Sequence, residues 1–238
     1  MWVWAEASTH MLERLNELCY HSSAMKRRLT ILWLAFGVIA LVASDYKMKT
    51  VKVLPIESYP ARTTVGGVTI AVDPYDTDEK SYAAFDVKKL NSQGYFPLHV
   101  IIQNTSQEFF LVRTRNIVLI TESAQQLFTT PAAALAEDLF KGSSLDKMSD
   151  KARDTASSRK LGTPLSDFTE KDLTNKLLEP GKVSNGFLFF FTPDPKKNLF
   201  AGSTLFIPKL EEEGTRKSVG PFSIPLNPAL SPAKSDTK

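Results

Sequence analysis

Four carboxylates crowd into one short segment of the chain, which reads D-P-Y-D-T-D-E. They are Asp73, Asp76, Asp78 and Glu79. Carboxylate oxygens are the ligands that Ca²⁺ prefers, so the segment could form a calcium-binding loop. Its spacing does not match an EF-hand, and such residues are also common in a solvated turn between a strand and a helix. A calcium site and an ordinary charged turn are therefore the two interpretations of this segment.

The chain offers little material for nucleophilic catalysis or zinc binding. A nucleophile needs a base beside it, but beyond residue 44 the chain has a single histidine, His99, and no cysteine. No G-x-S-x-G sequence is present to place a serine on a nucleophile elbow. One histidine without cysteine cannot supply the three or four ligands of a zinc site. We therefore expect His99 to be structural, and we predict no catalytic residue and no cofactor.

Two further patterns are interpreted as ordinary structure. Glu211, Glu212 and Glu213 precede Gly214 and predict a charged hairpin loop. Gly66-Gly67 lies near the start of a predicted strand and indicates a bulge or a turn. Neither pattern predicts a phosphate-binding loop.

A hydrophobic leader indicates where the rest of the chain acts. Residues 25–44 begin with the basic sequence Lys26 to Arg28, followed by an uncharged run from Leu29 to Ala43. Val42-Ala43-Ser44 supplies the small residues of a cleavage site. This layout is typical of a secretory signal peptide. We therefore expect the remainder to be exported, to the periplasm or outside the cell.

The leader leaves two questions open. The apolar run of residues 29–43 is shorter than the roughly 20 residues of a spanning helix, which favours a cleaved signal over an uncleaved inner-membrane anchor. Residues 1–24 would place the signal far from the chain start, so we interpret them as an over-extended start with translation beginning at Met25. The alternative is a short amphipathic helix, because apolar residues recur there at helical spacing.

The charge balance argues against nucleic acid as a partner. The chain carries 29 basic and 26 acidic residues, a formal net charge of +3. The two signs are interspersed and do not form a basic stripe. Without cysteine beyond the leader, the exported part must be stabilised by its core alone, which its length allows.

Alternating side chains predict short strands. The clearest is Pro97 to Asn104, where Leu98, Val100 and Ile102 share one face. Val183 to Pro193 is apolar on both faces and predicts a central strand that is covered from both sides. Tight connections favour antiparallel pairing. The other predicted strands are Thr64–Asp73, Glu108–Arg113, Asn116–Thr121, Gln126–Thr129, Ser203–Ile207 and Ser218–Leu226.

A helical insertion is predicted over residues 130–180. Thr130 and Pro131 can begin a first helix that ends before Gly142. Residues 142–164 are polar and predict a mobile loop. Thr169 is the expected N-cap of a second helix that ends near Leu178. Glu179-Pro180-Gly181-Lys182 then predicts a type II turn.

These elements predict a mainly β protein, an antiparallel β-sandwich of Greek-key type with a helical insertion. The expected organisation is an extended segment over residues 45–63 and a sandwich domain over residues 64–226. Residues 227–238 are rich in Pro, Ser and Lys and predict a disordered tail.

Three stretches resemble a group of uncharacterised bacterial exported Ig-like domains. They are F-P-L-H-V-I-I-Q-N-T-S (Phe96 to Ser106), N-I-V-L-I-T (Asn116 to Thr121) and L-E-P-G-K-V-S-N-G-F-L-F-F (Leu178 to Phe190). The resemblance covers roughly residues 60–226. It implies an Ig-like sandwich and carries no catalytic residue.

The sequence thus predicts an exported, non-enzymatic sandwich domain that acts as an interaction or structural module of the cell envelope. Its expected partner is another envelope protein, and its membrane contact is limited to the leader if that stays uncleaved. The alternatives are a metal-dependent enzyme or binding protein built on Asp73 to Glu79, and a membrane-tethered envelope protein.

Overall fold

The computed structural model describes residues 46–141, 163–173, 177–214 and 217–232. The predictions for residues 1–44 and for residues 142–162 of the predicted loop lie outside these ranges. Residues 163 and 164, also predicted as part of that loop, belong to a helix instead. In the described ranges the protein is mainly β, with antiparallel sheets and a few helices. None of the helices described is long and apolar enough to cross a membrane.

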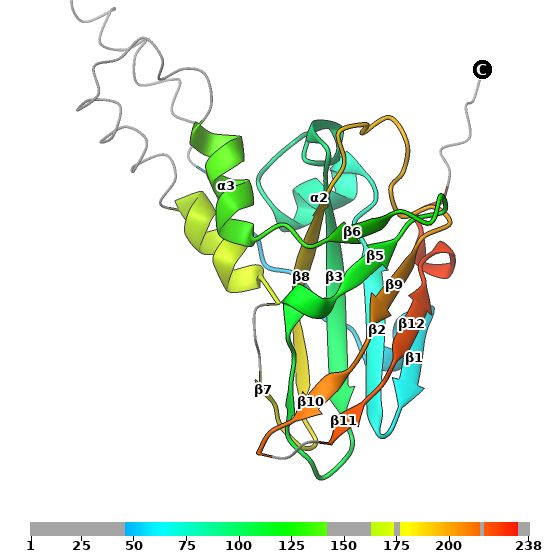
Figure 1. The fold of residues 1–238 in the computed structure, drawn as a ribbon. Helices are drawn as coiled ribbons and strands as arrows, with labels where there is room; N and C mark the ends of the chain where they lie inside the picture. Colours follow the sequence, from blue (N-terminus) through cyan, green and yellow to red (C-terminus); the bar gives the residue numbers. More distant parts are fainter. Residues whose placement is uncertain (1–45, 142–162, 174–176, 215–216, 233–238) are drawn as a thin grey trace, which may run out of the picture. The chain divides into compact units, whose positions relative to one another are not determined.

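The first sheet has the strand order β1-β2-β3-β8, and every neighbouring pair is antiparallel (Figure 1). Its strands are β1 (Ala61–Val65), β2 (Val68–Pro74), β3 (Tyr95–Asn104) and β8 (Val183–Phe191). The predicted alternation along β3 is confirmed, because Leu98, Val100 and Ile102 share one buried cluster.

Two smaller sheets form a second layer, with orders β11-β10-β4-β7 and β12-β9-β5-β6. The chain passes between them through short breaks from β4 to β5, from β9 to β10 and from β11 to β12. Their strands are β4 (Phe110–Leu111), β5 (Val118–Ile120), β6 (Gln126–Phe128), β7 (Leu177–Leu178), β9 (Thr204–Ile207), β10 (Leu210–Glu212), β11 (Ser218–Val219) and β12 (Phe222–Pro225).

The main core lies between the first sheet and this second layer. Val100 of β3, Leu119 of β5 and Ile224 of β12 belong to the same buried cluster. Burial of such aliphatic side chains is the main favourable term in folding.

Helices cover the opposite face of the first sheet (Figure 1). Phe187 and Phe189 of β8 pack there with Phe85, Phe168 and the apolar side of α3. The helices are α2 (Asp78–Ala84), α3 (Ala132–Lys141) and an unlabelled helix over residues 163–171. Short 3₁₀ turns are η1 (Ile56–Ser58), η2 (Asn91–Gln93), η3 (Thr114–Asn116) and η4 (Asn227–Ala229).

An extended segment, here called the arm (residues 46–55), precedes η1. It makes no ladder pairing with a strand. Ile56 and Tyr59, which follow it, cover Ala71 and Ile101 on the same face of the first sheet as the helices.

The prediction of β8 as a central strand is wrong. Both of its faces are buried, as expected, but β8 is the edge strand of its sheet. Other backbone segments close this edge: Thr130 N donates to Phe189 O at 2.7 Å, and Leu173 N donates to Phe187 O at 3.0 Å. The apolar run therefore reflects burial on two faces and not pairing on two edges.

The predicted position of the second helix is also wrong. The helix covers residues 163–171, and Thr169 lies in its last turn, where its hydroxyl donates to Leu165 O at 2.7 Å. The chain cannot continue as a helix because Asp172 bridges to β8 and Leu173 enters the main core. The type II turn is supported by the bond from Lys182 N to Glu179 O and by a φ of +69° at Gly181.

Several strand boundaries differ from the predictions. The single strand expected over Thr64–Asp73 is the hairpin of β1 and β2, with Gly66-Gly67 as its turn. The expected strand at Ser218–Leu226 is divided into β11 and β12. Glu211 and Glu212 belong to β10 and not to a hairpin loop.

The expected disorder from residue 227 onward is wrong for the residues that the structure describes. Residues 227–229 form η4, and Ser231 is tied to the body of the protein by hydrogen bonds to Asp76.

Candidate functional site

The acidic segment Asp73 to Glu79 links β2 to α2, and its carboxylates have separate partners. Asp73 forms an ion pair with Lys80 at 2.6 Å. Asp76 is buried and accepts hydrogen bonds from Asn198 Nδ2 at 3.2 Å, from Ser231 N at 2.9 Å and from Ser231 Oγ at 2.6 Å.

The other two carboxylates lie in the first turn of α2, where negative charge is favourable. Asp78 accepts hydrogen bonds from the backbone N–H of Ser92 at 3.1 Å and from its hydroxyl. Glu79 is exposed. Among the described residues no three His, Cys, Asp or Glu side chains gather around a common point. Calcium binding stays a prediction, which metal analysis of the purified protein tests.

His99 lies in the middle of β3 on the face covered by the helices. Its ring stacks on Phe187, with centroids 4.7 Å apart, and meets Tyr75 edge-on at 6.4 Å. Nε2 lies 3.1 Å from Asn185 Oδ1. His99 is buried among aromatic rings, and its structural role stays a prediction.

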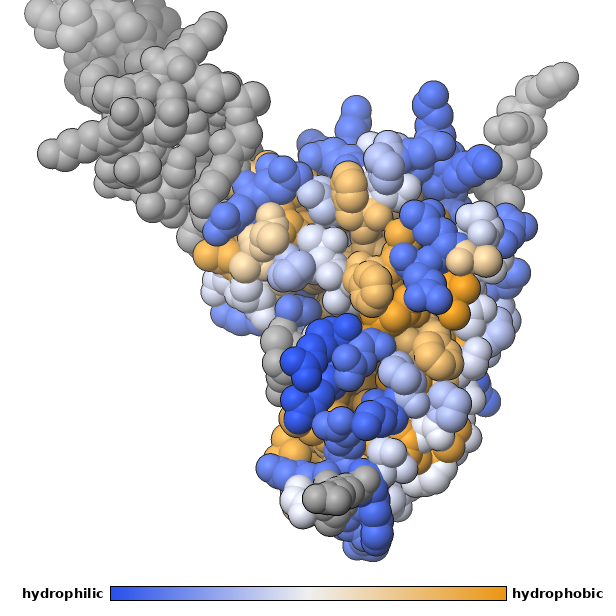
Figure 2. All heavy atoms as spheres, viewed as in Figure 1, coloured by the Kyte–Doolittle hydropathy of each residue, from blue (hydrophilic) through white to orange (hydrophobic). Residues whose placement is uncertain are grey.

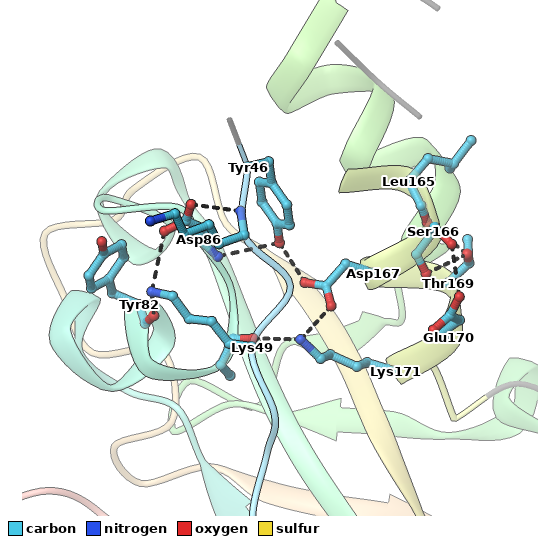
Figure 3. A network of polar contacts seen from close by, with 12 residues as sticks. Tyr46, Lys49, Tyr82, Asp86, Leu165, Ser166, Asp167, Thr169, Glu170 and Lys171 are labelled. Carbon is cyan, nitrogen blue, oxygen red and sulfur yellow. Dashed lines mark hydrogen bonds and ion pairs between the residues drawn. The ribbon is translucent and has the colours of Figure 1, made fainter. Parts of the chain in front are cut away.

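A network of polar contacts joins the arm to α2 and to the helix of residues 163–171 (Figure 3). It begins at Tyr46, whose hydroxyl donates to Asp167 Oδ2 at 2.6 Å and accepts from Asp86 N at 3.3 Å. Lys47 N donates to Asp86 Oδ2 at 3.0 Å. One tyrosine therefore connects three segments that are far apart in sequence.

Lys49 makes the second attachment of the arm. Its ammonium group lies 3.4 Å from Asp86 Oδ1 and 3.1 Å from the centroid of the Tyr82 ring, and it donates to Tyr82 O. A cation above an aromatic face is attracted by the ring quadrupole. The arm is thus held at both Tyr46 and Lys49.

Asp167 and Lys171 form the anchor on the helix side. Asp167 is fully buried, and its Oδ1 lies 2.6 Å from Lys171 Nζ, one helical turn away. Lys171 also donates to Ala84 O at 2.7 Å and lies over the Phe85 ring at 5.0 Å. The ion pair therefore also ties its helix to the end of α2.

The network shifts the pKa of two groups that it contains, Tyr46 and Asp86. Burial, together with the hydrogen bond to Asp167, raises the pKa of Tyr46 well above its ordinary value. Burial opposes ionisation of Asp86, but the Lys47 N–H and the Lys49 ammonium outweigh it and lower the pKa of that carboxyl. Tyr46 therefore stays protonated as a donor while Asp86 stays ionised as an acceptor.

A cleft of about 430 Å³ lies between the arm and this helix. Asn185 and Phe187 of β8, together with Asp167, Glu170 and Lys171, line one part of it, and residues 48–51 of the arm line the other. A second groove of about 420 Å³ runs beside β10, where Glu211 lies 2.9 Å from Arg113 Nε and 3.2 Å from Lys209 Nζ.

The sequence analysis missed the arm network. Its bonds join residues about 40 and 121 positions apart, and no local pattern signals such a pairing. A usable signal was the density of lysines in K-M-K-T-V-K, residues 47–52, directly after the apolar leader.

Comparisons with known proteins identify no family. No protein-family model matches the chain, and no curated protein matches it. The yjhA protein from Bacillus subtilis is similar at a TM-score of 0.34 and 13% identity, over 62% of this chain and 79% of its own. A functionally unknown protein from Listeria monocytogenes EGD-e has a TM-score of 0.34 and 11% identity, over 76% of this chain and 84% of its own. Likeness of this size carries no argument about the role of this chain.

Proposed function

We propose that this chain is an exported, non-enzymatic protein whose Ig-like β-sandwich serves as an interaction or structural module of the cell envelope. Two layers of antiparallel strands around one shared core support the sandwich. The leader over residues 25–44 supports export.

The observation that carries the interaction role is the surface at β6. This strand is the edge of its sheet, and Phe128 is 64% exposed while the neighbouring Leu127 packs against the core. Hydrophobic side chains gather on the face in Figure 2, over the region that β5, β6 and β9 occupy in Figure 1. An edge strand with an exposed aromatic side chain suits a protein partner that adds its own strand or apolar side chains. The partner is another envelope protein.

Site-specific crosslinking in intact cells tests this role. A photo-crosslinker at position 126, beside Phe128, should capture a defined envelope protein. The substitution Phe128→Asp should abolish the capture, while Phe109→Asp, at another exposed phenylalanine, should leave it unchanged. Capture that survives Phe128→Asp would contradict the role of β6. Recovery of the chain from the cytosol with residues 1–44 intact would contradict export.

A second candidate is a membrane-tethered protein that keeps its leader. The docked arm favours the tethered protein. Tyr46 is held by hydrogen bonds, and residues 44 and 45 alone separate it from the apolar run 29–43. Extraction at alkaline pH decides between the two: a tethered chain stays with the membranes and a processed chain is released.

A further inference from the structure

The arm carries both basic and apolar side chains that are exposed. Lys47, Met48, Lys52, Val53 and Leu54 are exposed. The arm lies beside the segment after α2, because Asp86 binds Lys47 N and Lys49. Lys88 and Lys89 follow Asp86 by two and three residues, within about 11 Å along the chain, and both are exposed. These seven residues are here called the arm face: Lys47, Met48, Lys52, Val53, Leu54, Lys88 and Lys89.

The lysines of the arm face differ from the inward lysines in their partners. The inward lysines Lys49 and Lys171 have carboxylate partners. Within the described residues, the four exposed lysines of the arm face form no ion pair with a carboxylate. The arm face is therefore a local excess of positive charge in a domain whose charges are otherwise mixed.

The arm face also contains three exposed apolar side chains. Met48 is 49% exposed, Val53 37% and Leu54 42%. Basic side chains interleaved with exposed aliphatic ones are typical of surfaces that rest on a bilayer, where ammonium groups meet phosphates and aliphatic groups enter the headgroup boundary. A nucleic acid would match the charge, but its phosphate backbone would leave the aliphatic side chains in water.

The position of the arm face favours the same ligand. The apolar run 29–43 ends three residues before Tyr46, and two intervening residues span about 7 Å at most. Because Tyr46 is docked on Asp167, the arm face begins within a few residues of the apolar run along the chain. We propose that the arm face binds the surface of an anionic lipid bilayer. This goes beyond the proposed function and rests on it for its cellular location.

Vesicle flotation with residues 45–238 tests the proposal. The three buried clusters draw on residues 56–226 of this part, so it contains its own core, and thermal melting verifies that each variant is folded. The chain should float with vesicles of phosphatidylglycerol and phosphatidylcholine and not with phosphatidylcholine alone. High salt should weaken the binding, since it screens exposed charges. The variant K47Q/K52Q/K88Q/K89Q should bind at least about tenfold more weakly.

A matched variant separates a local surface from net charge. R115Q/K182Q/K196Q/K197Q removes the same charge from exposed positions elsewhere and should bind within about twofold of the parent. Equal loss in both variants, equal binding to both kinds of vesicle, or no binding would overturn the proposal. Tighter binding to soluble polyglutamate or to an oligonucleotide than to the vesicles would also overturn it, in favour of a polyanionic macromolecule. Since flotation uses purified protein, its failure is distinct from a failure of export or of crosslinking at β6.

Discussion

Gly186 of β8 is a glycine because another backbone passes directly against it. A Cβ built at this position would lie 2.8 Å from both the N and the Cα atom of Leu173. Leu173 cannot retreat easily, since its N–H is bonded to Phe187 O and its side chain is buried in the main core. The missing side chain at Gly186 therefore allows the close approach that covers the edge of β8.

The substitution Gly186→Ala is expected to reduce the free energy of unfolding by about 1–3 kcal/mol, because the added methyl group overpacks this contact. Urea denaturation measures the change. Gly214→Asn is the control, since a Cβ there meets no atom within 4 Å and asparagine tolerates a φ of +76°. Equal stability of Gly186→Ala and the parent protein would show that the edge contact is loose.

Tyr95 makes stability depend on alkaline pH. Burial, together with the bond to Asp138 Oδ2 at 2.5 Å, raises the pKa of its hydroxyl from 10.0 to about 12. The folded state favours the protonated phenol, so this contribution is complete below pH 10 and is lost as the pH rises through 12. Tyr95→Phe should therefore be less stable than the parent at neutral pH, and the difference should shrink toward pH 12. Urea titrations across this range would refute the assignment if the difference stayed constant.

At the scale of elements, the helices and the arm share one face of the first sheet, and polar contacts join them. The Tyr46 hydroxyl donates to the helix of residues 163–171. The Lys49 ammonium group contacts α2 and Asp86, which follows that helix. Of the arm residues, Tyr46 and Val51 pack against the aromatic cluster under the helices. The arm therefore depends more on a few directed bonds than on buried area.

Tyr46→Phe should release the arm while leaving the sheets intact. The loss of the hydroxyl removes two hydrogen bonds and leaves Asp167 buried with fewer partners, at a cost of about 1–2 kcal/mol. Hydrogen exchange should accelerate for the amide of Lys47, which donates to Asp86, and the amides of β3 serve as the internal control. Unchanged exchange in the arm would mean that Lys49 alone holds it.

Sequence reasoning succeeded where a signal is local. The alternation of Leu98, Val100 and Ile102 gave the buried face of β3, and Pro180-Gly181 gave the turn before β8. It failed where a distant contact overrides the local pattern. The sequence around Thr169 predicts the start of a helix. In the structure the helix of residues 163–171 ends just after Thr169, because Leu173 pairs with β8. The arm network was out of reach for the same reason, because Tyr46 and Asp167 meet only in the folded chain.

At the scale of the whole molecule, the two ends of the described chain are both fastened to the body. Tyr46 is held by Asp167, and Ser231 is held by the buried carboxylate of Asp76, 155 positions away. The C-terminal residues before 233 therefore contribute to the fold and are not a loose tail.

Two truncations test the C-terminal attachment. Removal of residues 233–238 should leave the melting temperature unchanged. Removal of residues 227–238 should cost about 1–3 kcal/mol, because Asp76 loses both bonds from Ser231 and because Ala229 and Leu230 no longer pack against the core. Thermal melting compares them, and identical curves for the two truncations would contradict a role for Ser231.

The closed edge of β8 also bears on solubility. A strand with five consecutive residues F-L-F-F-F is a ready template for cross-chain pairing wherever its edge is bare. In the native protein the backbones at Thr130 and Leu173 occupy that edge, so the two helical segments act as gatekeepers against self-association. Any change that detaches them before the sheets unfold is expected to bare this edge and to promote aggregation, even though most of the core is still intact.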